Sequence, residues 1–276
     1  MKKIAFTLST FILCICVEAQ TQKTGSTAFV LGVVDKIQSV QLSESRTLNI
    51  YLPDGYAKDS LSKYPVIYLL DGSADEDFIH IAGLVQYLNF PWVNVLQKSI
   101  VVGIANVDRK RDFTFPTKNA ADLKEYPTTG GSKNFIAFLE KELQPYIEKK
   151  YRTNSKRTII GQSLGGLLAM QVLLEKPQLF DDYIIISASL WWSNEAILTE
   201  AEAVLKDPPA NNRRVFFSFG SEGKQMEIDA NRFVNILRKA SNSKFKVYIA
   251  PLPAETHGTI LHRAVYRAFE MFNKNE

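Results

Sequence analysis

The chain has 276 residues, of which 46% are hydrophobic, and this is enough to bury one large core or two small ones. The formal charge is only +4, with lysine and glutamate interspersed and no dense basic stripe, which argues against a nucleic-acid-binding protein. No internal repeat or low-complexity segment is visible, so we expect an ordinary globular domain.

The first residues have the pattern of a secretory signal peptide. Lysines at positions 2 and 3 precede an apolar run over residues 4–17, and residues 17–19 form a small-x-small cleavage site. The apolar run is too short to span a membrane, although a retained N-terminal anchor is the alternative interpretation. We therefore expect residues 1–19 to be a signal peptide and residues 20–276 to be a single domain with no stable membrane span.

Both cysteines of the sequence, Cys14 and Cys16, lie in the predicted signal peptide. The mature chain would therefore contain no disulfide, no thiolate nucleophile and no cysteine metal site. The three histidines are scattered and show no metal-ligand spacing, so we expect neither a metal nor a cofactor. An exported chain without disulfides suits a bacterial protein that is periplasmic or secreted.

Hydrophobic patterning predicts strands that alternate with helices along the chain. Residues 28–41 and 45–52 alternate loosely, which is typical of an antiparallel strand pair. Near-continuous apolar runs at 64–70 and 99–107 are typical of strands buried on both faces, and residues 133–151 have a helical period. The further predicted elements are a strand at 157–160, a helix at 166–174, strands at 182–189 and 214–219, a helix at 226–240, a strand at 244–251 and a helix at 259–272.

This order predicts an α/β fold with a mostly parallel central sheet, helices on both faces and an antiparallel N-terminal strand pair. Ligands of such sheets bind beyond the carboxyl ends of the strands. Five residues follow predicted strands, and we expect them to converge at this edge: Ser73, Ser163, Trp191, Glu222 and His257.

A Gly-Gln-Ser-Leu-Gly segment at 161–165 lies between a predicted strand and a predicted helix. A Gly-x-Ser-x-Gly at such a junction is typical of the nucleophile elbow of α/β-hydrolases, in which a sharp turn lifts the serine hydroxyl above the sheet. The turn leaves little room for flanking side chains, which explains the glycines. We therefore interpret Ser163 as a nucleophile, with an ordinary glycine-rich strand–helix turn as the alternative.

A serine hydroxyl needs a base, and the only histidines of the sequence are His80, His257 and His262. Hydrolases of this fold carry the histidine on the loop after the last strand, which is where His257 lies. His262 falls in the closing helix, and we expect it on the helix surface. His80 is expected in the first helix, with a place at the pocket mouth as the alternative.

The acid of a triad should follow the seventh predicted strand, where Glu222 is the first carboxylate. Glu227 and Asp229 are the next candidates, and a Ser–His dyad without an acid is a further alternative. Two backbone N–H groups should bind the oxyanion of the reaction. We expect one from Leu164, directly after the nucleophile, and the other from Ser73, after the third predicted strand.

Several further segments match a known family in order: YPVIYLLDG (64–72), DRKRDFT (108–114), LQPYIEKKYRT (143–153), IIGQSLGGLLAM (159–170), SASLWW (187–192), Phe-Gly-Ser-Glu-Gly (219–223) and Thr-His-Gly (256–258). On these segments the chain resembles the putative-esterase family of α/β-hydrolases, from about residue 27 to its end. That family includes enterochelin (siderophore) esterases, the esterase D type, and feruloyl or acetyl-xylan esterases. The siderophore branch looks nearest, because of the stretches at 108–112 and 189–192.

The resemblance implies a carboxylic ester hydrolase whose nucleophile is Ser163 and whose base is His257, with oxyanion donors at Ser73 and Leu164. The chain departs from many members of the family at Gln162, where a histidine often precedes the serine. It also has glutamate at 222 where aspartate is common. The first departure leaves the predicted nucleophile unchanged, and the second weakens the assignment of the acid.

Two pairs of side chains near predicted strand ends are candidates for substrate binding. Arg109 and Arg111 would reach an anionic or catecholate group, or instead form salt bridges with neighbouring aspartates. Trp191 and Trp192 would stack on an aromatic acyl group, or instead pack in the core.

Taken with the resemblance, the sequence predicts a serine esterase that acts on a small-molecule ester through an acyl-enzyme, without nucleic acid as a partner. A siderophore-type ester is the first expectation for the substrate. The alternatives are a carbohydrate-linked feruloyl or acetyl esterase, and a non-catalytic binding homologue that kept the fold.

Overall fold

The computed structural model describes residues 25–209 and 211–273. The predicted signal peptide at 1–19 lies outside the described residues. The chain divides after Val30, and the larger unit, which begins at Leu31, carries the helices and strands described below. In the described part of the chain, no helix is long and apolar enough to cross a membrane.

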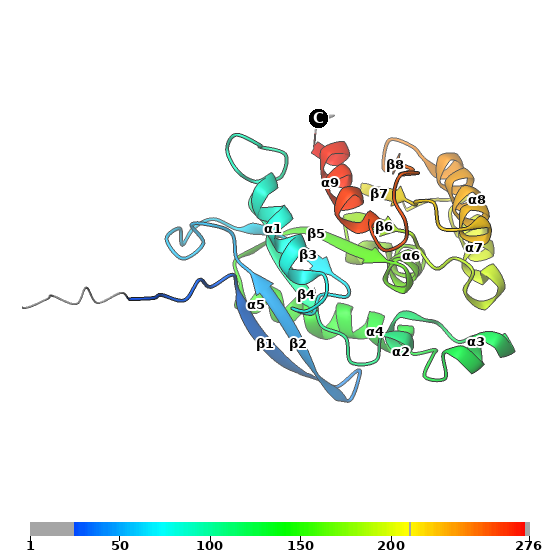
Figure 1. The fold of residues 1–276 in the computed structure, drawn as a ribbon, viewed down its shortest axis with the longest axis horizontal. Helices are drawn as coiled ribbons and strands as arrows, with labels where there is room; N and C mark the ends of the chain where they lie inside the picture. Colours follow the sequence, from blue (N-terminus) through cyan, green and yellow to red (C-terminus); the bar gives the residue numbers. More distant parts are fainter. Residues whose placement is uncertain (1–24, 210, 274–276) are drawn as a thin grey trace, which may run out of the picture. The chain divides into compact units, whose positions relative to one another are not determined.

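A single mixed sheet forms the centre of this unit (Figure 1). Its strands are β1 (Val33–Ser39), β2 (Glu44–Tyr51), β3 (Tyr64–Leu69), β4 (Ile100–Ile104), β5 (Thr153–Gln162), β6 (Asp182–Ile186), β7 (Arg213–Ser218) and β8 (Phe245–Ile249). They are arranged in the order β1-β2-β4-β3-β5-β6-β7-β8. The pairs β1–β2 and β2–β4 are antiparallel, and the other pairs are parallel. The predicted α/β fold with an antiparallel N-terminal pair is thereby confirmed.

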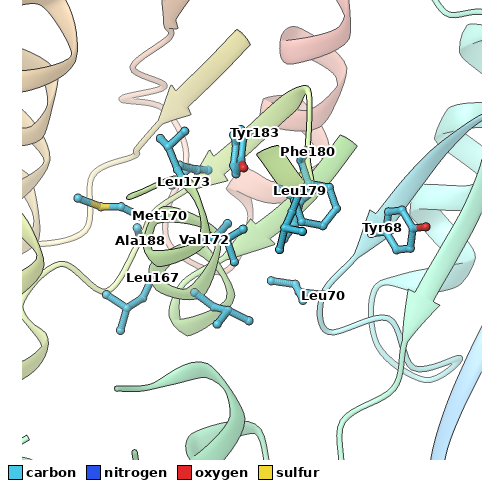
Figure 2. Close-up of a cluster of buried hydrophobic side chains, with 14 of the residues drawn as sticks. Tyr68, Leu70, Leu167, Met170, Val172, Leu173, Leu179, Phe180, Tyr183 and Ala188 are labelled. Carbon is cyan, nitrogen blue, oxygen red and sulfur yellow. The ribbon is translucent and has the colours of Figure 1, made fainter. Parts of the chain in front are cut away.

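The helices cover both faces of the sheet because alternate side chains of each strand point to opposite sides. One face packs against α1 (Phe78–Leu88) and α9 (Ile260–Asn273), which lie side by side in Figure 1. The other face packs against α4 (Ser132–Phe138), α5 (Gln144–Lys150), α6 (Leu164–Glu175), α7 (Trp192–Val204) and α8 (Lys224–Ala240). Figure 2 shows part of this second core, where Leu179 and Phe180 lie between the side chains of α6 and Tyr68. The rings of Tyr68 and Phe180 are 5.6 Å apart.

Some elements differ from the predicted ones. The helix expected at 133–151 is interrupted by a π-helical turn at Leu139–Leu143, which separates α4 from α5. The short helices α2 (Arg109–Phe113) and α3 (Ala120–Glu125) and the longer α7 were not predicted. The helices α2 and α3 have five and six residues, and fewer than two turns carry too little hydrophobic periodicity to identify a helix. The longer α7 begins with left-handed residues at Ser193–Glu195, which break its pattern.

Candidate active site

The turn between β5 and α6 holds Ser163 in a strained conformation, with φ 60° and ψ −121°. Left-handed backbone at a non-glycine residue is unfavourable and persists where the surrounding structure enforces it. Here the constraint is close packing: a Cβ on Gly161 would lie 2.2 Å from the Gly165 carbonyl oxygen, and one on Gly166 would lie 3.0 Å from the Ile186 carbonyl oxygen. The glycines thus allow helix and strand to approach closely enough to form the sharp turn.

Ser163 opens into a pocket of about 430 Å³ at the carboxyl ends of the strands. His257, from the loop between β8 and α9, lines the same pocket. The structure therefore brings together the predicted nucleophile and the predicted base, which are 94 positions apart in the sequence. The full lining consists of Asp71, Glu76, Asp77, Arg109, Gln162, Ser163, His257 and Gly258.

Behind the histidine lies Glu222, on the loop between β7 and α8. His257 Nδ1 is 3.5 Å from Glu222 Oε2, and no hydrogen-bond partner for Nδ1 is present in the described chain. The separation is longer than a normal hydrogen bond, as is common in ligand-free active sites. Among the three candidate acids, Glu222 is the one that contacts His257; Glu227 and Asp229 lie in α8, where Asp229 accepts a hydrogen bond from Gln225.

The Glu222 carboxylate is almost fully buried, with 2% of its side chain exposed. Burial by itself raises the pKa of Glu222, but the neighbouring His257 imidazole and the Ser187 hydroxyl, which donates to Oε1, lower it further than burial raises it. The Gly220 N–H donates to the same oxygen over 3.3 Å. The net effect is a pKa below the ordinary value for glutamate, so the group is ionised at neutral pH.

The two residues predicted to donate backbone N–H groups to an oxyanion, Leu164 and Ser73, follow β5 and β3. Leu164 is the first residue of α6, where helix geometry provides no intrahelical acceptor for the N–H. Ser73 follows β3, and within the described residues its N–H donates no hydrogen bond, whereas that of Gly72 donates to the Ile104 carbonyl. Neither residue is among those that line the pocket at Ser163, and their role as oxyanion donors stays a prediction.

A chain of hydrogen bonds ties the loops around the pocket together. The Arg109 guanidinium donates to both Asp71 oxygens over 2.6 and 2.9 Å, and also to the Gln162 carbonyl over 3.4 Å. The Gln162 side-chain amide in turn donates to the His257 carbonyl oxygen. The loops after β3, β4, β5 and β8 are thereby linked in one network.

The rim of the pocket carries further acidic groups. Burial raises the pKa of Asp77 to about 6, and the nearby Asp71 carboxylate adds to the shift. Glu76 accepts a hydrogen bond from the Asn106 amide over 3.1 Å. The rim therefore gains negative charge as the pH rises through the pKa of Asp77.

The other predicted substrate-binding residues lie in different surroundings. Arg111 donates to the carboxylates of Glu44 and Asp112 and does not line the pocket. Trp192 is fully buried, and its indole N–H donates to the Phe115 carbonyl over 2.9 Å. Trp191 is partly exposed, with its ring 6.0 Å from that of Tyr126.

Several residues of the site were not identified from the sequence. The Ser189 hydroxyl lies 3.3 Å from that of Ser163, and Ser187 donates to Glu222. Asp71 and Gln162 anchor the network around the pocket. The one available signal was position, because each of these residues lies at or near the carboxyl end of a predicted strand.

A larger hollow of about 860 Å³ lies between α7 and α8, but neither a serine nor a histidine lines it. In the described ranges, no group of three or more histidine, cysteine, aspartate or glutamate residues is arranged to hold a metal ion. The pocket at Ser163 is therefore the better candidate for an active site.

The sheet order and the strained serine between β5 and α6 are those of an α/β-hydrolase. The chain belongs to the Putative esterase family, whose model matches residues 39–263. It is 30% identical over 273 residues to the ferri-bacillibactin esterase BesA of Bacillus subtilis, covering 91% of this chain and 94% of that protein.

Two solved structures are similar in fold. An IroE-like serine hydrolase from Shewanella oneidensis gives a TM-score of 0.80 at 32% identity, covering 88% of this chain and 80% of that one. The BES protein from Bacillus cereus gives a TM-score of 0.78 at 27% identity, covering 91% of this chain and 97% of that one.

Proposed function

We propose that this protein is a serine carboxylic ester hydrolase that acts through an acyl-enzyme. One observation carries the proposal: Ser163 and His257 line a single pocket, and the buried Glu222 lies 3.5 Å behind the imidazole. Nucleophile, base and orienting acid in this arrangement are the components of a catalytic triad. Membership of an esterase family supports the same conclusion.

In the first half-reaction, the His257 imidazole takes the hydroxyl proton of Ser163 while the serine oxygen bonds to the ester carbonyl carbon. The oxyanion that develops accepts hydrogen bonds from the N–H groups of Leu164 and Ser73. Glu222 holds the ring in place and stabilises the imidazolium. The tetrahedral intermediate then expels the alcohol, which receives the proton from His257.

In the second half-reaction, a water molecule gives a proton to His257 and attacks the acyl carbon. The second tetrahedral intermediate collapses, Ser163 leaves with the proton, and the carboxylic acid is released. Every step uses groups of this chain and water.

For the substrate we propose a siderophore-type ester. The support is the 30% identity to a ferri-bacillibactin esterase over nearly the whole of both chains, together with the 32% identity to an IroE-like serine hydrolase.

We also propose that the protein is exported, because its first residues have the pattern of a signal peptide. The sequence of the exported protein, read from its N-terminus, should then begin at Gln20.

A substrate panel tests both parts of the proposal: a ferric trilactone siderophore, a feruloylated sugar, an acetylated sugar and short aryl esters. The expected result is hydrolysis with the siderophore as the best substrate, and a loss of about 10³-fold or more in Ser163→Ala. The exposed Ser60 provides a matched serine-to-alanine control that should retain activity. Preference for a sugar ester would refute the substrate, whereas full activity of Ser163→Ala would refute the mechanism.

A further inference from the structure

Another cavity, of about 410 Å³, lies at the opposite edge of the sheet from Ser163. Residues at the amino ends of β5, β7 and β8 and at the end of α9 contribute to its lining, and none of them lines the pocket at Ser163. In the described chain, Asp181 is the only carboxylate of this lining, which contains five cations: Lys156, Arg213, Arg214, Lys244 and Lys246. This basic cavity is therefore separate from the candidate active site.

The register of the sheet gathers the cations. Asp182 of β6 pairs with Arg214 of β7, and Arg214 pairs with Lys246 of β8. Side chains that pair in a parallel sheet point to the same face. Lys244 lies just before β8, and its carbonyl oxygen accepts a hydrogen bond from the Arg213 N–H over 2.7 Å. The sheet therefore fixes the backbones that carry these side chains.

The cations differ in how their charge is balanced. The Lys156 ammonium donates to the buried Asp182 carboxylate over 3.0 Å, and the Arg214 guanidinium donates to both oxygens of the same carboxylate over 2.8 and 2.9 Å. Lys244 and Lys246 are exposed, and their ammonium groups form no ion pair within the described residues. Their charge is therefore available to an anion in the basic cavity.

Arg213 adds a donor that is held in a fixed direction. Only 9% of its side chain is exposed, and its Nε and Nη1 donate to the carbonyl oxygens of Pro177 and Asn212 over 2.6 and 2.7 Å. Its Nη2 has no acceptor in the described chain, yet it is not sealed from solvent. Asp181 Oδ1 is 3.7 Å from Nη1, too far for a hydrogen bond. A rigid guanidinium thus lines the basic cavity with one N–H group unused.

We propose that the basic cavity binds a phosphate group. Arg213 Nη2 donates to one phosphate oxygen, and the ammonium groups of Lys244 and Lys246 balance the charge of the others. Guanidinium and ammonium groups are the usual partners of phosphate, and the rigid planar fork of arginine gives the contact its direction. The group can belong to a free phosphate compound or to the head of a phospholipid, because both present the same oxygens.

Calorimetric titration of sodium phosphate and of sodium pyrophosphate into the full chain tests the proposal, at pH 7.5 and constant ionic strength. The expected result is one pyrophosphate per chain. Lys244→Gln/Lys246→Gln should weaken its binding by about tenfold or more, because two opposite charges next to the anion are lost. Pyrophosphate should also raise the Tm of the parent chain, and by less in this variant, because a ligand of the folded state stabilises it.

Lys36→Gln/Lys133→Gln is the matched control. It lowers the net charge by the same amount, and both of its lysines are exposed and outside the basic cavity. Its affinity for pyrophosphate should equal that of the parent. Equal weakening in the two double variants would overturn the proposal, because it would show a general attraction of anions to a basic protein.

Arg213→Lys tests the guanidinium itself, since it keeps the charge and removes the fork. It should also weaken pyrophosphate binding, and if it does not fold, the lysine variants decide. Co-sedimentation with phosphatidylglycerol vesicles separates the two sources: vesicle binding that is lost in Lys244→Gln/Lys246→Gln, without pyrophosphate binding, would assign the phosphate group to a lipid.

A folded parent chain that binds neither phosphate compound nor the vesicles would overturn the proposal. The outcome is independent of the proposed hydrolase function, because the basic cavity lies at the other edge of the sheet. Lys244→Gln/Lys246→Gln should accordingly hydrolyse an aryl ester at the parent rate, which also shows that the variant is folded.

Discussion

Glu222 is held in surroundings very different from those of a surface carboxylate. Its side chain is 2% exposed, and it accepts hydrogen bonds from the Ser187 hydroxyl and the Gly220 N–H. Two donors leave the second oxygen facing His257. This geometry lets one residue orient the imidazole and stabilise its charged form, which is the work of the third member of a triad.

Replacing the carboxylate by an amide of the same shape tests this role. We expect Glu222→Gln to lower kcat by about 10²–10⁴-fold with little change in KM, because the imidazolium formed in the transition state loses its counter-charge. Steady-state kinetics on an aryl ester would measure both parameters. Unchanged kcat would mean that a Ser–His dyad suffices.

The lowered pKa of Glu222 also predicts how its contribution to stability depends on pH. Glutamate in an unfolded chain has a pKa of about 4.3, and the pKa of Glu222 in the folded chain is lower, so the ionised group stabilises the folded state above pH about 4.3. This contribution is lost as the pH falls through the folded pKa. The difference in free energy of unfolding between the parent and Glu222→Gln should therefore shrink between pH 7 and pH 3, as measured by urea denaturation.

At the scale of elements, the junction of β5 and α6 requires glycine, because there is no space for a side chain where the two elements meet. A methyl group on Gly161 would lie 2.2 Å from the carbonyl oxygen of Gly165, which belongs to the backbone of α6 and cannot rotate away. The helix and the strand would have to separate, and Ser163 would move with them. The elbow therefore requires glycine at 161 for packing and not for flexibility.

We expect Gly161→Ala to lower the free energy of unfolding by about 1–3 kcal/mol, the usual effect of overpacking, and to abolish most esterase activity. The matched control is Gly83→Ala in α1, where an added Cβ has no neighbour within 4 Å. That change should stabilise the protein by about 0.5–1 kcal/mol, because alanine is the better helix former. Thermal and urea unfolding of the two variants, with activity assays, provide the comparison; a fully active Gly161→Ala would contradict the packing argument.

At the scale of the whole molecule, the site is assembled from loops that follow six parallel strands. Glu222 comes from the β7 loop, Ser187 from the β6 loop, and the Asp71–Arg109–Gln162–His257 network joins the loops after β3, β4, β5 and β8. The sheet fixes where each loop starts, and the hydrogen bonds fix how the loops approach one another. Ser163 and His257 are thereby brought into the same pocket.

Gln162 is the link that is easiest to test. Gln162→Leu preserves volume but removes the amide that donates to the His257 carbonyl. A typical hydrogen bond has a net value of about 0.5–1.5 kcal/mol, so we expect kcat to fall by about 2–12-fold with KM nearly constant. Gln162→His restores an N–H donor and should recover part of the loss. Equal kcat in Gln162→Leu and the parent would show that the link has no catalytic role.

The sequence was most informative where function depends on local geometry. The Gly-x-Ser-x-Gly segment predicted the turn at Ser163, and the strand pattern predicted which loops share an edge of the sheet. Both follow from periodicity and turn chemistry within about fifteen residues. The choice of Glu222 over Glu227 or Asp229 followed from strand order in the same way.

Other features depend on contacts between distant segments, and the sequence left them open. Whether Arg109 or Arg111 faces the pocket depends on their partners: Arg109 is held by Asp71, and Arg111 is held by Glu44 and Asp112. Trp191 and Trp192 are adjacent, yet one is partly exposed and the other fully buried. No single-sequence pattern encodes such pairings, because they arise from tertiary packing.

The central claim, that His257 activates the Ser163 hydroxyl as the nucleophile, is tested most directly by mapping a fluorophosphonate adduct by mass spectrometry. The account predicts one adduct per chain on Ser163, strongly slowed in His257→Ala and absent in Ser163→Ala. Ser189, whose hydroxyl lies only 3.3 Å away, is an internal comparison for proximity without activation. A folded protein that remains unlabelled, or that is labelled at Ser189 instead, would contradict the account.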